Sequence, residues 1–456
     1  MKAAPSCADV AAAVAALQGI PDHGAKEFVA GGATLGEVFG MAAWLRTRLE
    51  DSGQRGTVCL ATDNRAAIAA ALLASLAGGP VVLLPYSFSG QALAGMHQAT
   101  GCTVALADAE QDIPPNMEAL RPPWETIASA WPRFKARPNE ELLRLYTGGS
   151  TGTPQLWSKT GINLFGEALF LAAHFGVSPA DRIVATVSPA HIYGLLYSVL
   201  LPLVSGASVA SATPSFPEEI IRTVREREAT ILVSVPPHYR ALRGKGPMGT
   251  SLRLAFSSAG MLDAEDNAEF CRHNESGIVE VYGSTETGGI GLRNRSRGET
   301  GFTPYPTLHW QIKDERLLIR SPYLSPGLPR DAEAFFPTND RVKPCGASGF
   351  HLIGRTDSIT KVGGKRVDLG DIREVIKQIP GITDCLALTL PETSGREHRI
   401  VVLAEGETVD IEAIRTTLAA RFEPYALPRA IKMIDHLPVK DNGKVDREAV
   451  LRLFAP

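Results

Sequence analysis

Short apolar runs alternate with longer segments of helical spacing through the first half of the chain. The runs at 57–62, 81–84 and 103–108 predict buried strands, and the segments 34–50 and 66–78 predict helices. Apolar strands that alternate with helices are typical of parallel sheets covered by helices. The pattern therefore predicts an α/β fold.

A second set of elements repeats this alternation. Strands are predicted at 182–187, 207–212, 230–235 and 252–258, and a helix is predicted at 216–228. We therefore expect a second layered sheet within the same N-terminal part of the chain.

The pattern changes near residue 355. Residues 351–379 predict a strand, a glycine turn, a second strand and a helix, and strands at 385–390 and 399–406 follow. This order is typical of a small α+β domain. The sequence therefore predicts two domains, an N-terminal domain of residues 1–355 and a C-terminal domain of residues 356–456.

Composition and charge exclude several classes of protein. Hydrophobic residues make up 44% and charged residues 21% of the 456 residues, which excludes a disordered tail and a membrane protein. The net charge of −3 gives no support to a nucleic-acid partner. The apolar stretch 66–85 is broken by Gly78, Gly79 and Pro80, so we expect a helix, a turn and a strand there and no membrane span. The six cysteines are scattered, which indicates reduced thiols in a cytoplasmic protein.

One loop suits a phosphate group. Residues 145–155 read LYTGGSTGTPQ, with three glycines and four hydroxyl side chains after an apolar run. Glycines let backbone N–H groups turn inward and hydroxyls add donors. A Walker A loop is excluded because no Gly-Lys-Ser/Thr follows at the required spacing. Taken alone, the loop fits a flexible Gly/Ser turn equally well.

Four further motifs follow in fixed order: EVYGSTETGGIG at 280–291, FFPTNDRV at 335–342, GRTDSITKVGGKRV at 354–367 and DNGKVDR at 441–447. The ordered set resembles the adenylate-forming superfamily of acyl-CoA synthetases, peptide-synthetase adenylation domains and luciferases. Together with the HIYGLLY run from His191, it looks most like the stand-alone ligases that load aryl or acyl acids onto acyl-carrier proteins in aryl-polyene (xanthomonadin-type) pigment clusters.

The resemblance implies a large N-terminal domain of layered α/β subdomains and a small mobile α+β C-terminal domain. Since the segment 291–335 is short, the barrel-like third subdomain is expected to be trimmed. The implied reaction has two steps. A carboxylate attacks the α-phosphorus of ATP in the presence of Mg²⁺ to give acyl-AMP and pyrophosphate, and a thiol then takes the acyl group. Two anions meet in the first step, so cations must be placed beforehand to neutralise the charge.

By the same resemblance, the nucleotide would contact two groups of residues. A loop would wrap the β- and γ-phosphates with Thr147, Gly148, Gly149, Ser150, Thr151 and Gly152. Tyr282, beside Gly283, would stack on adenine, and Asp340 would accept the ribose hydroxyls with help from Arg355. Singly, Tyr282 could be a core aromatic and Asp340 a turn acid, and only the complete set of motifs favours the functional interpretation.

The resemblance assigns the reaction itself to a few side chains. Thr285 would contact the α-phosphate, Glu286 would hold Mg²⁺, and Lys444 would bridge the attacking carboxylate and the phosphate. His191 would gate the carboxylate between the two steps. An ordinary solvated lysine and a histidine that caps a helix are the alternatives for Lys444 and His191.

The second step implies a different arrangement of the domains. The small domain would rotate about Asp357, which withdraws Lys444 from the site. Gly363 and Gly364 would then form a narrow tunnel for a pantetheine arm, although a plain Gly-Gly hairpin turn explains the same pair.

The acid is expected to be aromatic. The segment 188–203, which aligns with one wall of the acid pocket, has no acidic residue to pair with a substrate ammonium, and this argues against an amino acid. Small residues on the other walls favour a flat slot for a hydroxybenzoate-like acid. The residues assigned to the pocket are His191, Tyr193, Gly194, Ser258, Gly260, Gly288 and Gly289.

Several departures from the superfamily pattern keep rival functions open. Gln155 stands where the loop usually has lysine, Asn339 replaces a glycine and Arg373 replaces an acid. Lys159 is a candidate replacement for the missing cation. The first rival function is a ligase that uses free CoA, and the second is a nucleotide-binding paralogue without catalysis, motivated by Gln155.

Overall fold

The structure is a computed structural model. It describes residues 4–19, 24–51, 56–123, 134–147, 155–274, 276–362, 365–391, 398–406, 409–439 and 445–454. Contacts divide the chain into two compact units, the first made of residues 1–309 and 320–334 and the second of residues 310–319 and 335–456. The predicted boundary between residues 355 and 356 stays a prediction.

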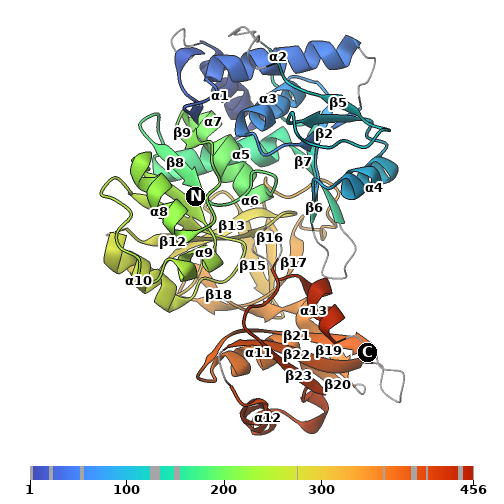
Figure 1. Ribbon diagram of the computed structural model, residues 1–456, viewed down its shortest axis with the longest axis vertical. Coiled ribbons are helices and arrows are strands. Elements are labelled where there is room, and N and C mark those ends of the chain that lie inside the picture. The colour runs from blue at the N-terminus through green and yellow to red at the C-terminus, as the bar shows by residue number, and fades with distance from the viewer. Residues whose placement is uncertain are drawn as a thin grey trace. The chain divides into compact units, whose positions relative to one another are not determined.

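The first sheet of the large unit is almost entirely parallel. Its six described strands run in the order β5-β4-β2-β3-β6-β7, and only the pair β6 and β7 is antiparallel. These strands are β2 (Thr57–Ala61), β3 (Val81–Leu84), β4 (Val104–Ala107), β5 (Glu118–Leu120), β6 (Glu141–Thr147) and β7 (Gln155–Thr160). The helices around it are α2 (Leu35–Asp51), α3 (Arg65–Leu76) and α4 (Gly90–Thr100), which Figure 1 shows in blue tones. The predicted strands at 57–62, 81–84 and 103–108 are confirmed.

The second sheet of the large unit carries eight described strands in the order β1-β9-β8-β10-β11-β12-β13-β14. Pairing is parallel from β1 to β12 and antiparallel from β12 to β14. The strands are β1 (Val29–Ala30), β8 (Arg182–Ala185), β9 (Ser208–Ala210), β10 (Ile231–Ser234), β11 (Leu254–Ser257), β12 (Ile278–Ser284), β13 (Gly288–Asn294) and β14 (Thr303–Pro304). Its helices are α1 (Cys7–Gly19), α5 (Gly161–Phe175), α6 (Ile192–Leu195), α7 (Leu201–Ser205), α8 (Pro217–Glu226), α9 (Pro236–Ala241) and α10 (Ala264–Asn274).

A π-helical turn at Leu196–Leu200 joins α6 to α7. The N–H of Leu201 bonds to the carbonyl of Leu196, and Pro202 follows without an N–H of its own. The structure confirms the predicted helix at 216–228 and the predicted strands at 182–187, 207–212, 230–235 and 252–258. The π-helical turn was not predicted.

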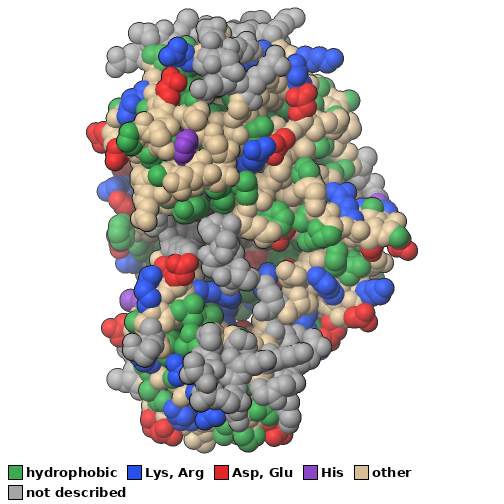
Figure 2. All heavy atoms as spheres, turned by 90° about the vertical axis from the view of Figure 1, so that its right-hand side faces the viewer, with side chains coloured by type: hydrophobic (Ala, Val, Ile, Leu, Met, Phe, Trp, Pro, Cys, Tyr) green, Lys and Arg blue, Asp and Glu red, His purple; other side chains and the backbone are tan. Residues whose placement is uncertain are grey.

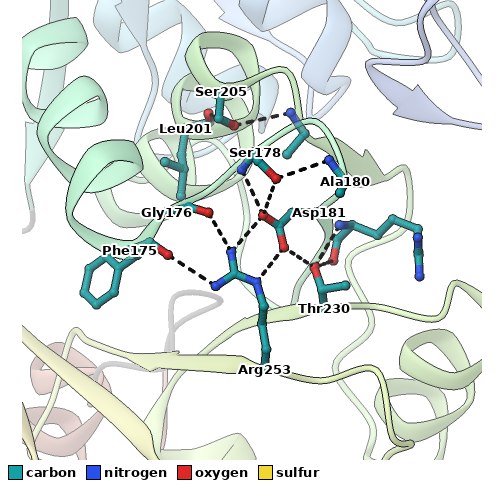
Figure 3. A network of polar contacts seen from close by, with 11 residues as sticks. Phe175, Gly176, Ser178, Ala180, Asp181, Leu201, Ser205, Thr230 and Arg253 are labelled. Carbon is teal, nitrogen blue, oxygen red and sulfur yellow. Dashed lines mark hydrogen bonds and ion pairs between the residues drawn. The ribbon is translucent and has the colours of Figure 1, made fainter.

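A polar network fixes the edge of this sheet at which the parallel strands begin (Figure 3). The Asp181 carboxylate accepts hydrogen bonds from Arg253 at 2.7 and 2.8 Å and from the Thr230 hydroxyl at 2.7 Å. Arg253 also donates to the carbonyls of Phe175 and Gly176 at the end of α5. Since Asp181, Thr230 and Arg253 directly precede β8, β10 and β11, this network lies at the amino ends of these strands.

The second unit is built from smaller sheets. A four-stranded sheet contains β15 (His309–Lys313), β16 (Arg316–Arg320), β17 (Phe336–Cys345) and β18 (Gly349–Arg355), and a hairpin pairs β19 (Ile359–Val362) with β20 (Lys365–Asp368). A three-stranded sheet of β21 (Ile382–Pro391), β22 (His398–Gly406) and β23 (Ala430–Ile434) follows, with α11 (Leu369–Lys377), α12 (Ile411–Ala419) and α13 (Arg447–Leu453). The predicted strands and helix of 351–379 are confirmed, and the glycine turn at Gly363 and Gly364 lies outside the described residues.

Every helix in the described part of the chain is too short or too polar to cross a membrane. Figure 2 shows acidic and basic side chains interspersed on the face that it draws.

Candidate active site

Several predicted residues lie at one edge of the eight-stranded sheet, where its parallel strands have their carboxyl ends. Tyr282 lies near the carboxyl end of β12, Ser258 follows β11, and the segment that begins at Ser188 follows β8. In open α/β sheets, ligands bind outside the carboxyl ends of the strands. This edge, opposite the Asp181 network, is therefore the candidate active site.

The motif at 280–291 forms a tight hairpin. Ser284 pairs with Gly288, so that a loop of Thr285, Glu286 and Thr287 joins β12 to β13. Reciprocal hydrogen bonds between Ser284 and Thr287 close the loop: the Ser284 N–H donates to the Thr287 hydroxyl at 3.0 Å, and the Thr287 N–H donates to the Ser284 hydroxyl at 3.3 Å. Gly288 takes the left-handed conformation, with φ of +68°, as such three-residue loops require.

The side chains of this hairpin are partly open. Tyr282, Thr285 and Glu286 are each half-buried. The Tyr282 ring lies 5.4 Å from the Phe302 ring, centroid to centroid. Gly283 is a glycine because a Cβ there would overlap the carbonyl of Gly288. The structure thus holds Tyr282, Gly283, Thr285 and Glu286 on one hairpin, and their assigned roles stay predictions.

Two buried charged side chains, Lys159 and Glu167, contact the backbone of this hairpin. Lys159 is 1% exposed and donates from Nζ to the backbone carbonyls of Tyr323 at 2.9 Å and Glu286 at 3.3 Å. Glu167 is 3% exposed and accepts the N–H of Gly289 at 2.8 Å. Burial lowers the pKa of Lys159 and raises the pKa of Glu167, and the charge of each opposes the shift of the other.

The hypothesis that Lys159 supplies the cation missing at Gln155 is not supported. Its ammonium lies inside the protein and is occupied by backbone carbonyls, whereas Gln155 is exposed at the start of β7. Sequence reasoning missed Glu167 altogether. The available signal was a lone carboxylate within the otherwise apolar helical run 164–172.

The acid-pocket candidates surround α6. His191 is half-buried and occupies the N-cap position of α6, as the capping alternative expects, but its side chain makes no capping hydrogen bond to the helix. The Tyr193 hydroxyl donates to the Ser234 carbonyl at 3.2 Å, and its ring lies 5.0 Å from the Tyr197 ring. Gly194 is buried, and a Cβ there would overlap the carbonyl of Ser188.

The other predicted wall residues differ in exposure. The Ser258 hydroxyl donates to the Val281 carbonyl at 2.8 Å, and Gly260 is exposed. Gly288 and Gly289 are buried, with the Glu167 carboxylate packed directly on them. Whether all four line the acid pocket stays a prediction.

A hydrogen-bonded chain behind Tyr193 was also missed from sequence. The Ser234 hydroxyl lies 2.8 Å from the Thr186 hydroxyl, which lies 2.7 Å from Nδ1 of His238. Burial lowers the pKa of His238. These residues lie at and beyond the carboxyl ends of β8 and β10, where the parallel topology itself was the signal.

Two predicted ribose-binding residues meet in the second unit. Asp340 and Arg355 are paired across β17 and β18, with Oδ1 and Nη1 3.5 Å apart. Asp340 is 18% exposed in its side chain and Arg355 is 51% exposed. Asn339 accepts a hydrogen bond from Arg316 at 3.2 Å and its carbonyl accepts one from Thr356 at 3.2 Å, so the substituted position is tied into the sheet.

Several predicted residues lie outside the described residues. These are Gly148, Gly149, Ser150, Thr151, Gly152, Gly363, Gly364 and Lys444. Thr147 ends β6 opposite Gln155 of β7, and Asp357 lies in a short 3₁₀ turn at Thr356–Ser358, but the structure describes only the backbone of Thr147 and Asp357.

Known proteins identify the family of this chain. Residues 34–327 match the family of AMP-binding enzymes. The 4-coumarate–CoA ligase of Rhodobacter capsulatus is 32% identical over 301 residues, which cover 65% of this chain and 73% of that ligase. The anthranilate–CoA ligase of Pseudomonas aeruginosa is 26% identical over 461 aligned residues, with 89% of this chain and 88% of that ligase covered.

A solved structure gives the same assignment at the level of the fold. ATP-bound MatB from Rhodopseudomonas palustris superposes with a TM-score of 0.82 at 19% identity and covers 98% of this chain and 99% of its own. The chain belongs to the family of AMP-binding enzymes. It is an adenylate-forming acid–thiol ligase, and the predicted fold, with a large N-terminal and a smaller C-terminal domain, is confirmed.

Proposed function

We propose that this enzyme activates a hydroxybenzoate-like aryl acid with ATP and transfers it to the phosphopantetheine thiol of an acyl-carrier protein. The carboxylate oxygen forms a bond to the α-phosphorus and pyrophosphate leaves. The thiol sulfur then forms a bond to the acyl carbon, AMP leaves, and the thiol proton is released.

The neutral, aromatic surroundings of α6 carry the proposal for an aryl acid. Tyr193 and Tyr197 pack ring against ring beside His191, and no carboxylate occurs in 188–203. An aromatic ring gains dispersion and stacking energy against such side chains, whereas a substrate ammonium would be left unpaired. Relatives named for coumarate and anthranilate support the same class of acid.

The proposed roles follow the resemblance of the motifs to the adenylate-forming superfamily. Tyr282 stacks on adenine, Thr285 contacts the α-phosphate, and Asp340 with Arg355 binds the ribose. Lys444 bridges the carboxylate and the α-phosphate in the first step, and His191 gates the carboxylate between the two steps.

Glu286 is the proposed ligand of Mg²⁺. Among the described residues, no group of three or more His, Cys, Asp or Glu side chains could hold a metal ion. A single half-buried carboxylate fits Mg²⁺, because this ion is commonly held by one or two carboxylates, phosphate oxygens and water. When bound, Mg²⁺ neutralises charge on the phosphates.

The substitution Glu286→Gln tests this role. It should weaken the Mg²⁺ dependence of ATP binding, measured by calorimetry at several Mg²⁺ concentrations. An unchanged metal titration would show that Glu286 is not the ligand.

The acceptor has a second candidate, free CoA, because the relatives named above are CoA ligases. The carrier-protein proposal rests on the resemblance of the motifs to stand-alone carrier-protein ligases. Arg373, a basic residue of the second unit, is already bonded to Asp384 at 2.8 Å. A docking patch would therefore depend on other cations of the second unit.

Two assays test the proposal. A pyrophosphate-release assay with benzoates, cinnamates and fatty acids should give its highest kcat/KM with a benzoate, and a preference for fatty acids would refute the aryl proposal. Product formation with CoA and with holo-carrier protein then decides the acceptor, since a strong preference for CoA would replace the carrier protein. ATP binding without acid-dependent exchange would instead indicate the paralogue without catalysis.

A further inference from the structure

Two buried charges lie behind the hairpin that carries Thr285 and Glu286. Lys159 comes from β7 and Glu167 from α5, which are neighbouring elements in the chain, and both contact the distant hairpin. The Glu286 carbonyl accepts two hydrogen bonds, one from Lys159 at 3.3 Å and one from the Ser325 N–H at 2.8 Å. The Lys159 ammonium therefore binds the backbone of the loop directly.

The other end of the loop is held by the anion. The Glu167 carboxylate accepts the Gly289 N–H at 2.8 Å, and a Cβ at Gly289 would lie 2.6 Å from its Oε1. A Cβ at Gly288 would lie 2.7 Å from Oε2. Both carboxylate oxygens thus pack directly on the backbone that follows Glu286.

The cluster extends toward the acid-pocket helix. Tyr305 and Tyr197 are each 1% exposed, and Tyr197 belongs to the π-helical turn after α6. A Cβ at Gly289 would overlap the Tyr305 hydroxyl, so this ring and Glu167 share one face of the glycine. Side chains from α5 and β7 and the Tyr305 ring therefore pack against the hairpin.

Two buried charges such as Lys159 and Glu167 are a costly way to fill the interior of a protein. Removing a cation and an anion from water costs several kcal/mol for each ion, and apolar residues of similar volume commonly give equal or greater stability. The directional hydrogen bonds to Glu286 and Gly289 are what apolar residues cannot replace.

We propose that Lys159 and Glu167 are positioning residues that fix the Thr285–Thr287 loop so that Glu286 and Thr285 meet Mg²⁺ and the α-phosphate. This inference rests on the proposed roles of those two side chains. Lys159 fixes the Glu286 backbone itself, and Glu167 fixes the start of β13.

The test separates positioning from packing with three variants. Lys159→Met removes the ammonium, Glu167→Gln keeps an acceptor for the Gly289 N–H, and the double variant leaves no unpaired buried charge. We expect the double variant to unfold as cooperatively as the wild type but to bind Mg²⁺·ATP about tenfold more weakly, the lower limit for loss of groups behind a metal ligand. Calorimetry measures this affinity without turnover.

A matched control comes from the opposite edge of the sheet. Asp181→Asn should lower thermal stability while the affinity for Mg²⁺·ATP stays unchanged, because Asp181 belongs to the amino-end network. Transfer of the acyl group from supplied acyl-AMP should also be unchanged in the double variant.

Wild-type affinity for Mg²⁺·ATP in the double variant would overturn the proposal and leave a packing role only. If Lys159→Met does not fold, the affinities of Glu167→Gln and the double variant decide the question. Failure of the proposed function is a separate result, since it would be seen as absence of acid-dependent pyrophosphate exchange in the wild-type enzyme.

Discussion

At the scale of single residues, Gly194 determines how His191 is presented. The Ser188 hydroxyl donates to Asp63 at 2.7 Å and accepts the Ala190 N–H at 3.1 Å, which fixes the turn before α6. Gly194 packs so closely on this turn that no side chain fits between them. The absence of one methyl group thereby sets the direction in which α6 leaves the turn.

Gly194→Ala should lower stability by roughly 1–3 kcal/mol, the usual cost of overpacking. It should also raise KM for the acid because the turn that carries His191 must shift. Urea unfolding and steady-state kinetics measure the two effects.

Gly95→Ala is the matched control. Gly95 is exposed in α4 with a Cβ position 4.0 Å from its nearest neighbour, so alanine should add roughly 0.5–1 kcal/mol of stability. Unchanged stability and KM in Gly194→Ala would mean that the turn relaxes without consequence.

At the scale of elements, the parallel sheets could be predicted because their strands are short, apolar and buried, as in Val81–Leu84 and Ile231–Ser234. The sequence predicted that Thr285 and Glu286 belong to the site, but it did not predict the hairpin that carries them. The hairpin is held by hydrogen bonds to Lys159 and Glu167, which lie more than a hundred residues earlier in the chain. A local sequence pattern cannot predict a contact between such distant residues. The π-helical turn at 196–200 also depends on tertiary packing and on Pro202 rather than on periodicity.

The Asp181 network makes a pH-dependent contribution to stability. Burial alone would raise the pKa of Asp181, but hydrogen bonds from Arg253, Thr230 and Ser178 outweigh it and hold the pKa below its usual value. A lowered pKa in the folded state adds stability above the unfolded value of about 3.9, and this stability is lost as the pH falls through the folded value.

Asp181→Asn should therefore lower the free energy of unfolding at pH 7 by roughly 1.5 kcal/mol. We take the lower end of the range for hydrogen bonds to a charged group because the Arg253 side chain is 39% exposed and solvent screens its charge. The difference from the wild type should stay constant as the pH falls and shrink only below about pH 3.9. Urea unfolding across this range checks it, and a difference that closes near neutral pH would contradict the lowered pKa.

At the scale of the whole molecule, the two compact units separate the proposed tasks. The hairpin of Tyr282 to Glu286 and the α6 wall lie in the large unit, and Asp340, Arg355 and Asp357 lie in the second. Lys444 belongs to the second unit in sequence, so the proposed reaction needs residues from both.

Lys444→Ala should slow adenylation by about 10²–10³-fold, the usual cost of losing one transition-state donor. Transfer from supplied acyl-AMP should survive, because the proposed second step withdraws Lys444 from the site. Single-turnover measurements of each half-reaction check this, and an equal loss in both would contradict the two-arrangement account.

The Asp181 network has a practical consequence for redesign. The network stabilises the amino ends of β8, β10 and β11, whereas the proposed chemistry takes place at their carboxyl ends. Thermal stability and substrate specificity can therefore be changed independently. A library directed at positions 178–182, 230 and 253 would then change the survival of the enzyme at high temperature and leave its choice of acid alone.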